Sequence, residues 1–133
     1  MSEKTYKVVM SERCYRFKPD AIPGHAPRAP GVYEFVTFDA QRRPVVLFVG
    51  LAGSSIVESL EDHWLGKGKP TREELFAAAP DVYFDFVASS DAAGPDDLKD
   101  IAGALQSRHK PKLNTAPAPG SGRYSAVKVE EVG

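Results

Sequence analysis

Two runs of β-branched and aromatic residues dominate the apolar pattern of this chain, and a polar segment separates them. The runs cover residues 32–38 and 45–49, and the polar connector covers residues 39–44. Val, Tyr, Phe and Thr at this density are typical of a pleated, half-buried surface. The pattern therefore predicts a β-hairpin with a polar turn. Each strand has a glycine near an aromatic residue, in G-V-Y (31–33) and F-V-G (48–50).

Apolar residues then recur at helical spacing. Ile56, Leu60 and Trp64 lie four residues apart and predict a helix of about three turns. A second stripe follows Pro95, a residue that suits the first turn of a helix, and Pro111 ends this helix. The members of this stripe are Leu98, Ile101, Ala102 and Leu105.

Two shorter elements are predicted between these helices. Thr71 and Glu74 have the spacing of a capping box, which predicts a short helix at residues 73–79. Apolar residues alternate with others through residues 81–88, which predicts a third strand. Helices and strands in this order favour a small α+β fold, with a mainly antiparallel three-stranded central sheet flanked by helices.

The two ends of the chain add further elements. Residues 5–10 and 14–17 predict short N-terminal strands, and the proline-rich stretch 18–30 predicts an extended loop without regular helix. Residues 115–133 predict a flexible linker with a short strand at 124–129, packed on the same domain. We therefore expect N-terminal strands and a lead-in at 1–22, a central domain at 23–114 and a tail at 115–133.

Composition limits the function classes. With 133 residues, 42% hydrophobic and 26% charged, the chain has the size and composition of one globular domain. It has no apolar run near the roughly 20 residues of a membrane helix and no signal-peptide core, so we expect a cytoplasmic protein without a membrane partner. The single cysteine, Cys14, excludes an intrachain disulfide. The net charge of −1 gives no global attraction to nucleic acid, although residues 108–128 are locally basic.

The hairpin motifs, the order of elements and the P-K-L-N sequence after the last helix (111–114) resemble the GIY-YIG nuclease domain. The resemblance covers about residues 23–114. It implies a metal-dependent phosphodiesterase fold with two neighbouring tyrosines, an arginine on the first helix, a metal-binding glutamate on the last helix and a supporting asparagine. Phosphoryl transfer needs such groups because charge on the phosphate must be neutralised and a base must be positioned.

When the functional residues of the family are matched to this sequence by motif, few of them are present. Tyr33 and Asn114 match the first tyrosine and the asparagine, and His63 matches a histidine of the first-helix pattern. Phe48 replaces the second tyrosine, Ser59 the arginine and Ala102 the glutamate. Sliding the match by one residue places Glu58 at the arginine position, which suits a phosphate less well. Asp100, about 200° around the helix from Ala102, is expected to face away from it.

Three functions remain open after this comparison. The first is a non-catalytic GIY-YIG-like domain that binds or scaffolds, with nucleic acid as one ligand and no cofactor. The second is a divergent DNA endonuclease that uses Mg²⁺ and displaced carboxylates, for which the candidates are Glu58, Glu61 and Asp62. The third is a protein-interaction or self-assembling protein without a nucleic-acid role. The candidate phosphate contacts are Arg42, Arg43, Arg108, His109, Lys110 and Lys112.

Overall fold

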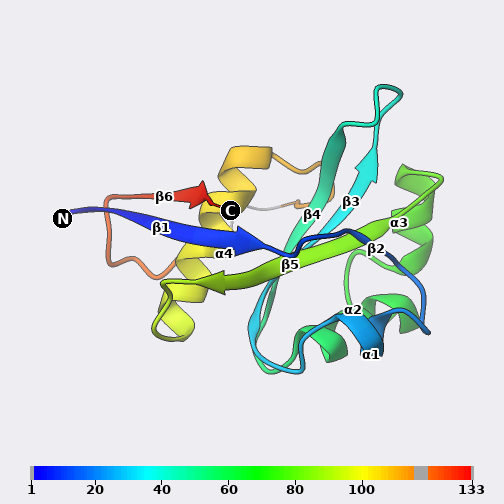
Figure 1. Ribbon diagram of the computed structural model, residues 1–133, viewed down its shortest axis with the longest axis horizontal. Helices are drawn as coiled ribbons and strands as arrows, with labels where there is room; N and C mark the ends of the chain where they lie inside the picture. The colour runs from blue at the N-terminus through cyan, green and yellow to red at the C-terminus, as the bar shows by residue number, and fades with distance from the viewer. Residues whose placement is uncertain (1, 116–119, 133) are drawn as a thin grey trace.

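A computed structural model describes residues 2–115 and 120–132 of the chain (Figure 1). Its four described helices are α1 (Ile22–His25), α2 (Ile56–Leu65), α3 (Arg72–Ala78) and α4 (Pro95–His109). The strands are β1 (Glu3–Met10), β2 (Tyr15–Arg16), β3 (Gly31–Phe38), β4 (Pro44–Ala52), β5 (Tyr83–Ser90) and β6 (Ala126–Glu131). The expected hairpin, helices and third strand are therefore present, with shifts of a few residues at their ends.

The strands form one mixed, curled sheet of six strands in the order β4-β3-β5-β1-β6, and β2 pairs with β5 beside β1. All neighbouring strands are antiparallel except β1 and β6, which are parallel. The predicted α+β class is thus confirmed, but the predicted three-stranded central sheet is too small. Strands β4, β3 and β5 do pair in that antiparallel order, and β1, β2 and β6 extend the sheet because β5 offers its second edge to β1 and β2.

The stretch 18–30 contains a one-turn helix, α1, which contradicts the expectation of an extended loop. Pro23 lies in the first turn, where its missing N–H is not needed for a helical hydrogen bond. Ile22 is fully buried, and this burial holds the turn against α2. A proline-rich segment therefore forms a single helical turn here because one apolar side chain anchors it.

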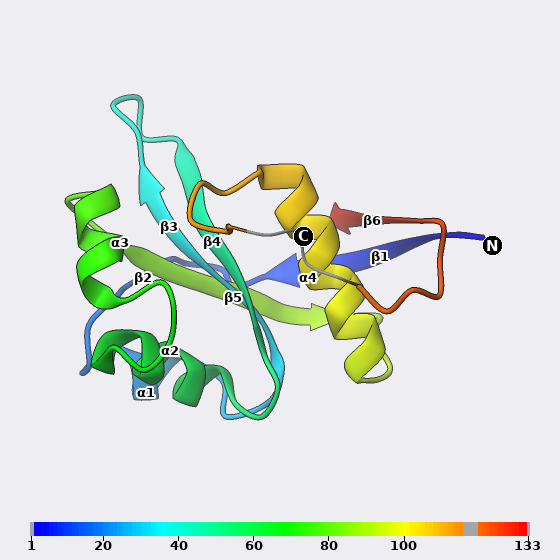
Figure 2. The ribbon, with the colours of Figure 1, turned by 180° about the vertical axis from the view of Figure 1, so that it is seen from behind.

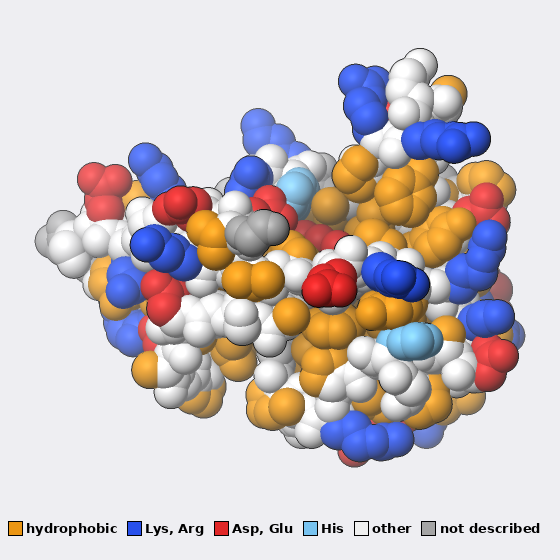
Figure 3. All heavy atoms as spheres, in the orientation of Figure 1, with side chains coloured by type: hydrophobic (Ala, Val, Ile, Leu, Met, Phe, Trp, Pro, Cys, Tyr) orange, Lys and Arg blue, Asp and Glu red, His pale blue; other side chains and the backbone are white. Residues whose placement is uncertain are grey.

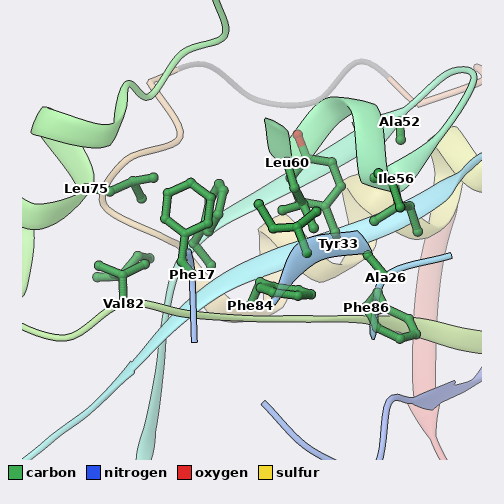
Figure 4. Close-up of a cluster of buried hydrophobic side chains, with 14 of the residues drawn as sticks. Phe17, Ala26, Tyr33, Ala52, Ile56, Leu60, Leu75, Val82, Phe84 and Phe86 are labelled. Atoms are coloured by element: carbon green, nitrogen blue, oxygen red, sulfur yellow. The ribbon is translucent and has the colours of Figure 1, made fainter. Parts of the chain in front are cut away.

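Helices cover both faces of the β3–β4 hairpin: α4 lies on one side, and α2 and α3 lie on the other (Figure 2). Neighbouring residues of a strand point to opposite faces, so Val32 packs under α4 and Tyr33 packs under α2. We call the two clusters the α2-side core and the α4-side core. Figure 4 shows the α2-side core, in which Tyr33, Leu60 and Phe84 lie together.

The tail returns to the sheet, and the expected C-terminal strand is β6, parallel to β1. Arg123 joins it to α4 through ion pairs with Asp97 at 2.6 Å and Asp100 at 2.9 Å. Ser121 also hydrogen-bonds to Asp100, which is buried at this contact. Residues 116–119 of the expected flexible linker lie outside the described residues.

Candidate functional site

The centre of the β3–β4 hairpin is built around the ring of Tyr33. Tyr33 and Gly50 are paired across the two strands, and the tyrosine ring lies over the glycine. A Cβ atom at position 50 would overlap the ring, with the Tyr33 hydroxyl oxygen 2.5 Å away. Phe48 lies beside Tyr33 with 6.5 Å between ring centroids. The glycine of F-V-G is thus required by close packing of an aromatic ring, and the structure brings Tyr33 and Phe48 together as expected.

His63 completes this centre and is buried, with 4% of its surface exposed. Its Nε2 lies 2.7 Å from the Tyr33 hydroxyl and its Nδ1 lies 2.8 Å from the carbonyl oxygen of Pro70. A carbonyl can only accept, so Nδ1 carries the proton and Nε2 of the neutral ring accepts from Tyr33. Both nitrogens of His63 are therefore used in a buried chain from Tyr33 to Pro70.

The protonation states follow from burial. Burial lowers the pKa of His63 below its ordinary value, although the Pro70 carbonyl opposes this change. Burial also raises the pKa of the Tyr33 hydroxyl far above its ordinary value, and the nearby charge of Asp62 adds to this effect. At neutral pH both groups are consequently uncharged. Tyr33 therefore holds its proton at neutral pH, with 4% of its surface exposed.

Two further residues that match functional positions of the family, Ala102 and Ser59, bring no charged group to Tyr33. Ala102 packs in the α4-side core, on the opposite face of the hairpin from Tyr33. A longer side chain at position 102 would therefore point away from the tyrosine. Ser59 lies half-buried on α2 and carries no charge. The alanine and serine thus leave the hairpin centre without a fixed cation or a carboxylate from α4.

Asn114 has a structural role at the free edge of β4. Its side-chain oxygen accepts from the N–H of Val49 at 2.9 Å, and its amide donates to the Val49 carbonyl at 3.0 Å. The N–H of Leu113 donates to the carbonyl of Leu47 at 3.1 Å. The segment after α4 therefore satisfies backbone groups of an edge strand.

The candidate carboxylates lie together on α2, and of the three, Asp62 acts electrostatically on Tyr33 and His63 at the hairpin centre. Glu58, Glu61 and Asp62 line a shallow pocket of about 290 Å³ with Pro19, Ile22, Trp64 and Leu65. Within residues 2–115 and 120–132, no group of three or more His, Cys, Asp or Glu side chains is arranged to hold a metal ion. Asp100 is bonded to the tail and does not approach the hairpin.

The candidate cations are carried by the projecting β3–β4 tip and by the chain at the C-terminal end of α4, and both lie on the upper side of the view in Figure 1. Arg43 pairs with Asp39 at 3.1 Å, and Arg108 pairs with Glu131 at 3.1 Å. Arg42 and Lys110 are exposed and have no ion-pair partner among the described side chains. Lys112 is exposed and lies 3.5 Å from the carbonyl oxygen of Ala78. We call Arg42, Arg43, Arg108, Lys110 and Lys112 the basic edge.

The turn that carries Arg42 and Arg43 is well ordered by hydrogen bonds. One carboxylate oxygen of Asp39 accepts from the N–H groups of Gln41 and Arg43, each at 2.9 Å. Arg42 has a φ of 62°, which lets the chain reverse direction. The charge of Asp39 is thus directed to the turn and to Arg43, and the guanidinium of Arg42 remains available.

A cluster of buried polar side chains lies under α4. Of its members, only His109 is among the candidate site residues predicted from the sequence. Glu34 on β3 pairs with Asp85 on β5, and its Oε2 lies 3.7 Å from Nε2 of His109. Cys14 lies 3.9 Å from Asp85. One polar atom of each of Glu34, Asp85 and His109 has no hydrogen-bond partner among the described residues. Burial and the neighbouring Asp85 raise the pKa of Glu34 to about 10, so this carboxyl keeps its proton at neutral pH. The feature of the sequence that could have indicated this cluster is a glutamate, Glu34, within an otherwise apolar strand.

Comparison with known proteins found no matching family model, curated protein or solved structure. None of the described helices has the length and apolar character to span a membrane.

Proposed function

We propose that this chain is a non-catalytic binding module with a GIY-YIG-like fold, and that its ligand is nucleic acid. The observation that carries the proposal is the state of Tyr33, whose buried hydroxyl donates to a neutral His63. The nearby positions hold Phe48 and Ser59, and Ala102 belongs to the opposite core. In this interpretation the hairpin centre is a structural core, and strands β4-β3-β5 are the retained central sheet of the family.

The basic edge supports nucleic acid as the ligand. The hairpin tip and the C-terminal end of α4, which carry these cations, lie on the same side of the molecule (Figure 1), and Figure 3 shows Lys and Arg side chains at the tip and on other parts of the visible face. Clustered Arg and Lys side chains bind phosphates and release counterions from the nucleic acid, which makes affinity depend on salt. The acidic residues of α2 line a separate pocket beside α1. On the edge itself, Asp39 and Glu131 pair with Arg43 and Arg108, so among the described side chains its unpaired charge comes from Arg42, Lys110 and Lys112.

The proposal predicts binding without cleavage. A fluorescently labelled DNA strand incubated with the protein and Mg²⁺ or Mn²⁺ is expected to stay intact. Its fluorescence anisotropy should rise when the protein binds, and it should fall again when salt is added to the complex. The double variant Arg42→Gln/Lys110→Gln should lower the slope of log affinity against log salt by about 1 to 2, because each lost phosphate contact lowers it by about 1. The matched control Lys67→Gln/Lys99→Gln removes the same charge from exposed positions outside the basic edge.

Two results would reject this function. Cleavage that disappears in Tyr33→Phe would establish the nuclease alternative, because that change removes only the hydroxyl. Absence of salt-dependent binding would instead leave a protein partner as the ligand.

A further inference from the structure

The sheet face beyond the C-terminal end of α4 exposes aromatic side chains. Phe38, near the end of β3, is 41% exposed, and Tyr83 on β5 is half-buried beside it. Their ring centroids lie 5.2 Å apart with the rings nearly perpendicular. Figure 3 shows hydrophobic side chains below the projecting hairpin tip. Large exposed apolar side chains that lie together on a face indicate an interaction surface.

Arg16 adds a planar cation to the two rings. Its guanidinium carbon lies 5.2 Å from the centroid of Tyr83, in a cation–π contact. The arrangement is fixed by strand pairing, since Tyr83 pairs with Arg16 on one side and with Val36 on the other. We call Arg16, Tyr83 and Phe38 the aromatic platform. Three planar groups on three neighbouring strands offer π-faces that any nucleobase can stack on.

The charge around the aromatic platform is favourable for a polyanion. Arg42 and Arg43 stand at the tip beyond Phe38, and Arg16 is exposed at the opposite side, where its contact with Asp81 is a long 3.7 Å. Glu34 and Asp85 belong to the same face of the sheet, but burial raises the pKa of both carboxyls. Glu34 and Asp85 therefore repel phosphate weakly. The carboxylates of Asp81 and Asp39 are each paired with an arginine, Arg16 and Arg43 respectively.

We propose that the aromatic platform binds single-stranded nucleic acid, with bases stacked on Phe38 and Tyr83 and phosphates beside Arg16, Arg42 and Arg43. This inference rests on the proposed function and narrows its ligand. The bases of a duplex are stacked on each other and cannot present their faces to a protein sheet. The platform consequently selects single strands, whereas the basic edge alone does not.

Fluorescence anisotropy with a fluorescein-labelled oligothymidylate of about 12 nucleotides, and with a duplex of the same length, tests this assignment. The single strand is expected to bind about tenfold more tightly than the duplex. Phe38→Ala should weaken single-strand binding about tenfold, because one lost stacking contact has that effect. It should leave the salt slope unchanged, and Phe38→Tyr should retain the affinity. Phe76→Ala on α3, which removes an aromatic side chain of 39% exposure, is the matched control.

The possible failures are distinguishable. Equal affinity for single strand and duplex, or unchanged binding by Phe38→Ala, would overturn the platform assignment while salt-dependent binding would still support the proposed function. Absence of binding to both probes would overturn both. Far-ultraviolet circular dichroism of each variant excludes unfolding as the cause of a loss.

Discussion

Glu34→Gln is expected to stabilise the protein at neutral and alkaline pH, by as much as about 3 kcal/mol at pH 7. The folded chain holds the Glu34 proton with a pKa of about 10, whereas the unfolded chain has the ordinary value of 4.5. Between these values the unfolded state loses the proton and the folded state keeps it. Each pH unit above 4.5 therefore lowers the free energy of unfolding by about 1.4 kcal/mol. Glutamine imitates the protonated carboxyl and removes this loss.

Chemical denaturation between pH 7 and 8.5 measures the effect. His63 and His109, whose pKa values are lowered by burial, are neutral in the folded chain, and in the unfolded chain they are mostly neutral across this window. The window ends at 8.5 because the unfolded chain ionises Cys14 above it, whereas burial raises the pKa of this thiol to about 11 in the folded chain. The wild-type protein should lose roughly 2 kcal/mol across the window. Glu34→Gln should lose much less, with a remainder from Asp85.

Glu3→Gln, an exposed carboxylate on β1, is the control for the change of one negative charge. A wild-type protein whose stability is flat across this window would show that Glu34 is ionised in the fold. Equal pH dependence of Glu34→Gln and wild type would lead to the same conclusion.

Gly50→Ala is expected to destabilise the fold by about 3 kcal/mol. The added Cβ would overlap the Tyr33 ring, which is confined by Phe35, Phe48 and His63. Overpacking of a closed core forces side chains from their preferred rotamers and shifts the backbone. Displacement of the ring also breaks the hydrogen bond from Tyr33 to His63, which leaves buried polar atoms without partners.

Urea denaturation of Gly50→Ala beside Gly53→Ala measures this cost. Gly53 follows β4 and has open space where a Cβ would be added, so its substitution should change stability by less than about 1 kcal/mol. In a Tyr33→Ala background, Gly50→Ala should cost much less, because the overlapping ring is gone. Similar losses in both backgrounds would mean that the glycine has a backbone role and that the ring is not the obstacle.

Elements with a strong local pattern could be predicted from the sequence. The hairpin is determined by two β-rich runs and a polar turn, and α2 by a stripe at spacing four. The parallel pairing of β6 with β1 joins residues at opposite ends of the chain, and local periodicity carries no information about it. The larger sheet was missed for that reason.

The sequence was sufficient to identify residues of the candidate site, but it did not predict their burial or their contacts. The motif match places His63 on the first helix, but its burial depends on contacts with Tyr33 on β3 and Pro70 after α2. The opposite placement of Ala102 and Tyr33 follows from which helix covers which face of the sheet. Glu34 lies within an otherwise apolar strand, and its partner Asp85 is set by the register of β5.

The most direct test of the central claim is a ¹H–¹⁵N NMR titration with an oligothymidylate in the presence of Mg²⁺. The account predicts an intact oligonucleotide, chemical-shift changes at Arg42, Arg43 and Lys110, and unchanged signals for Tyr33 and His63. Changes concentrated at Tyr33 and His63, or a degraded oligonucleotide, would contradict a structural hairpin centre and a binding surface at the basic edge.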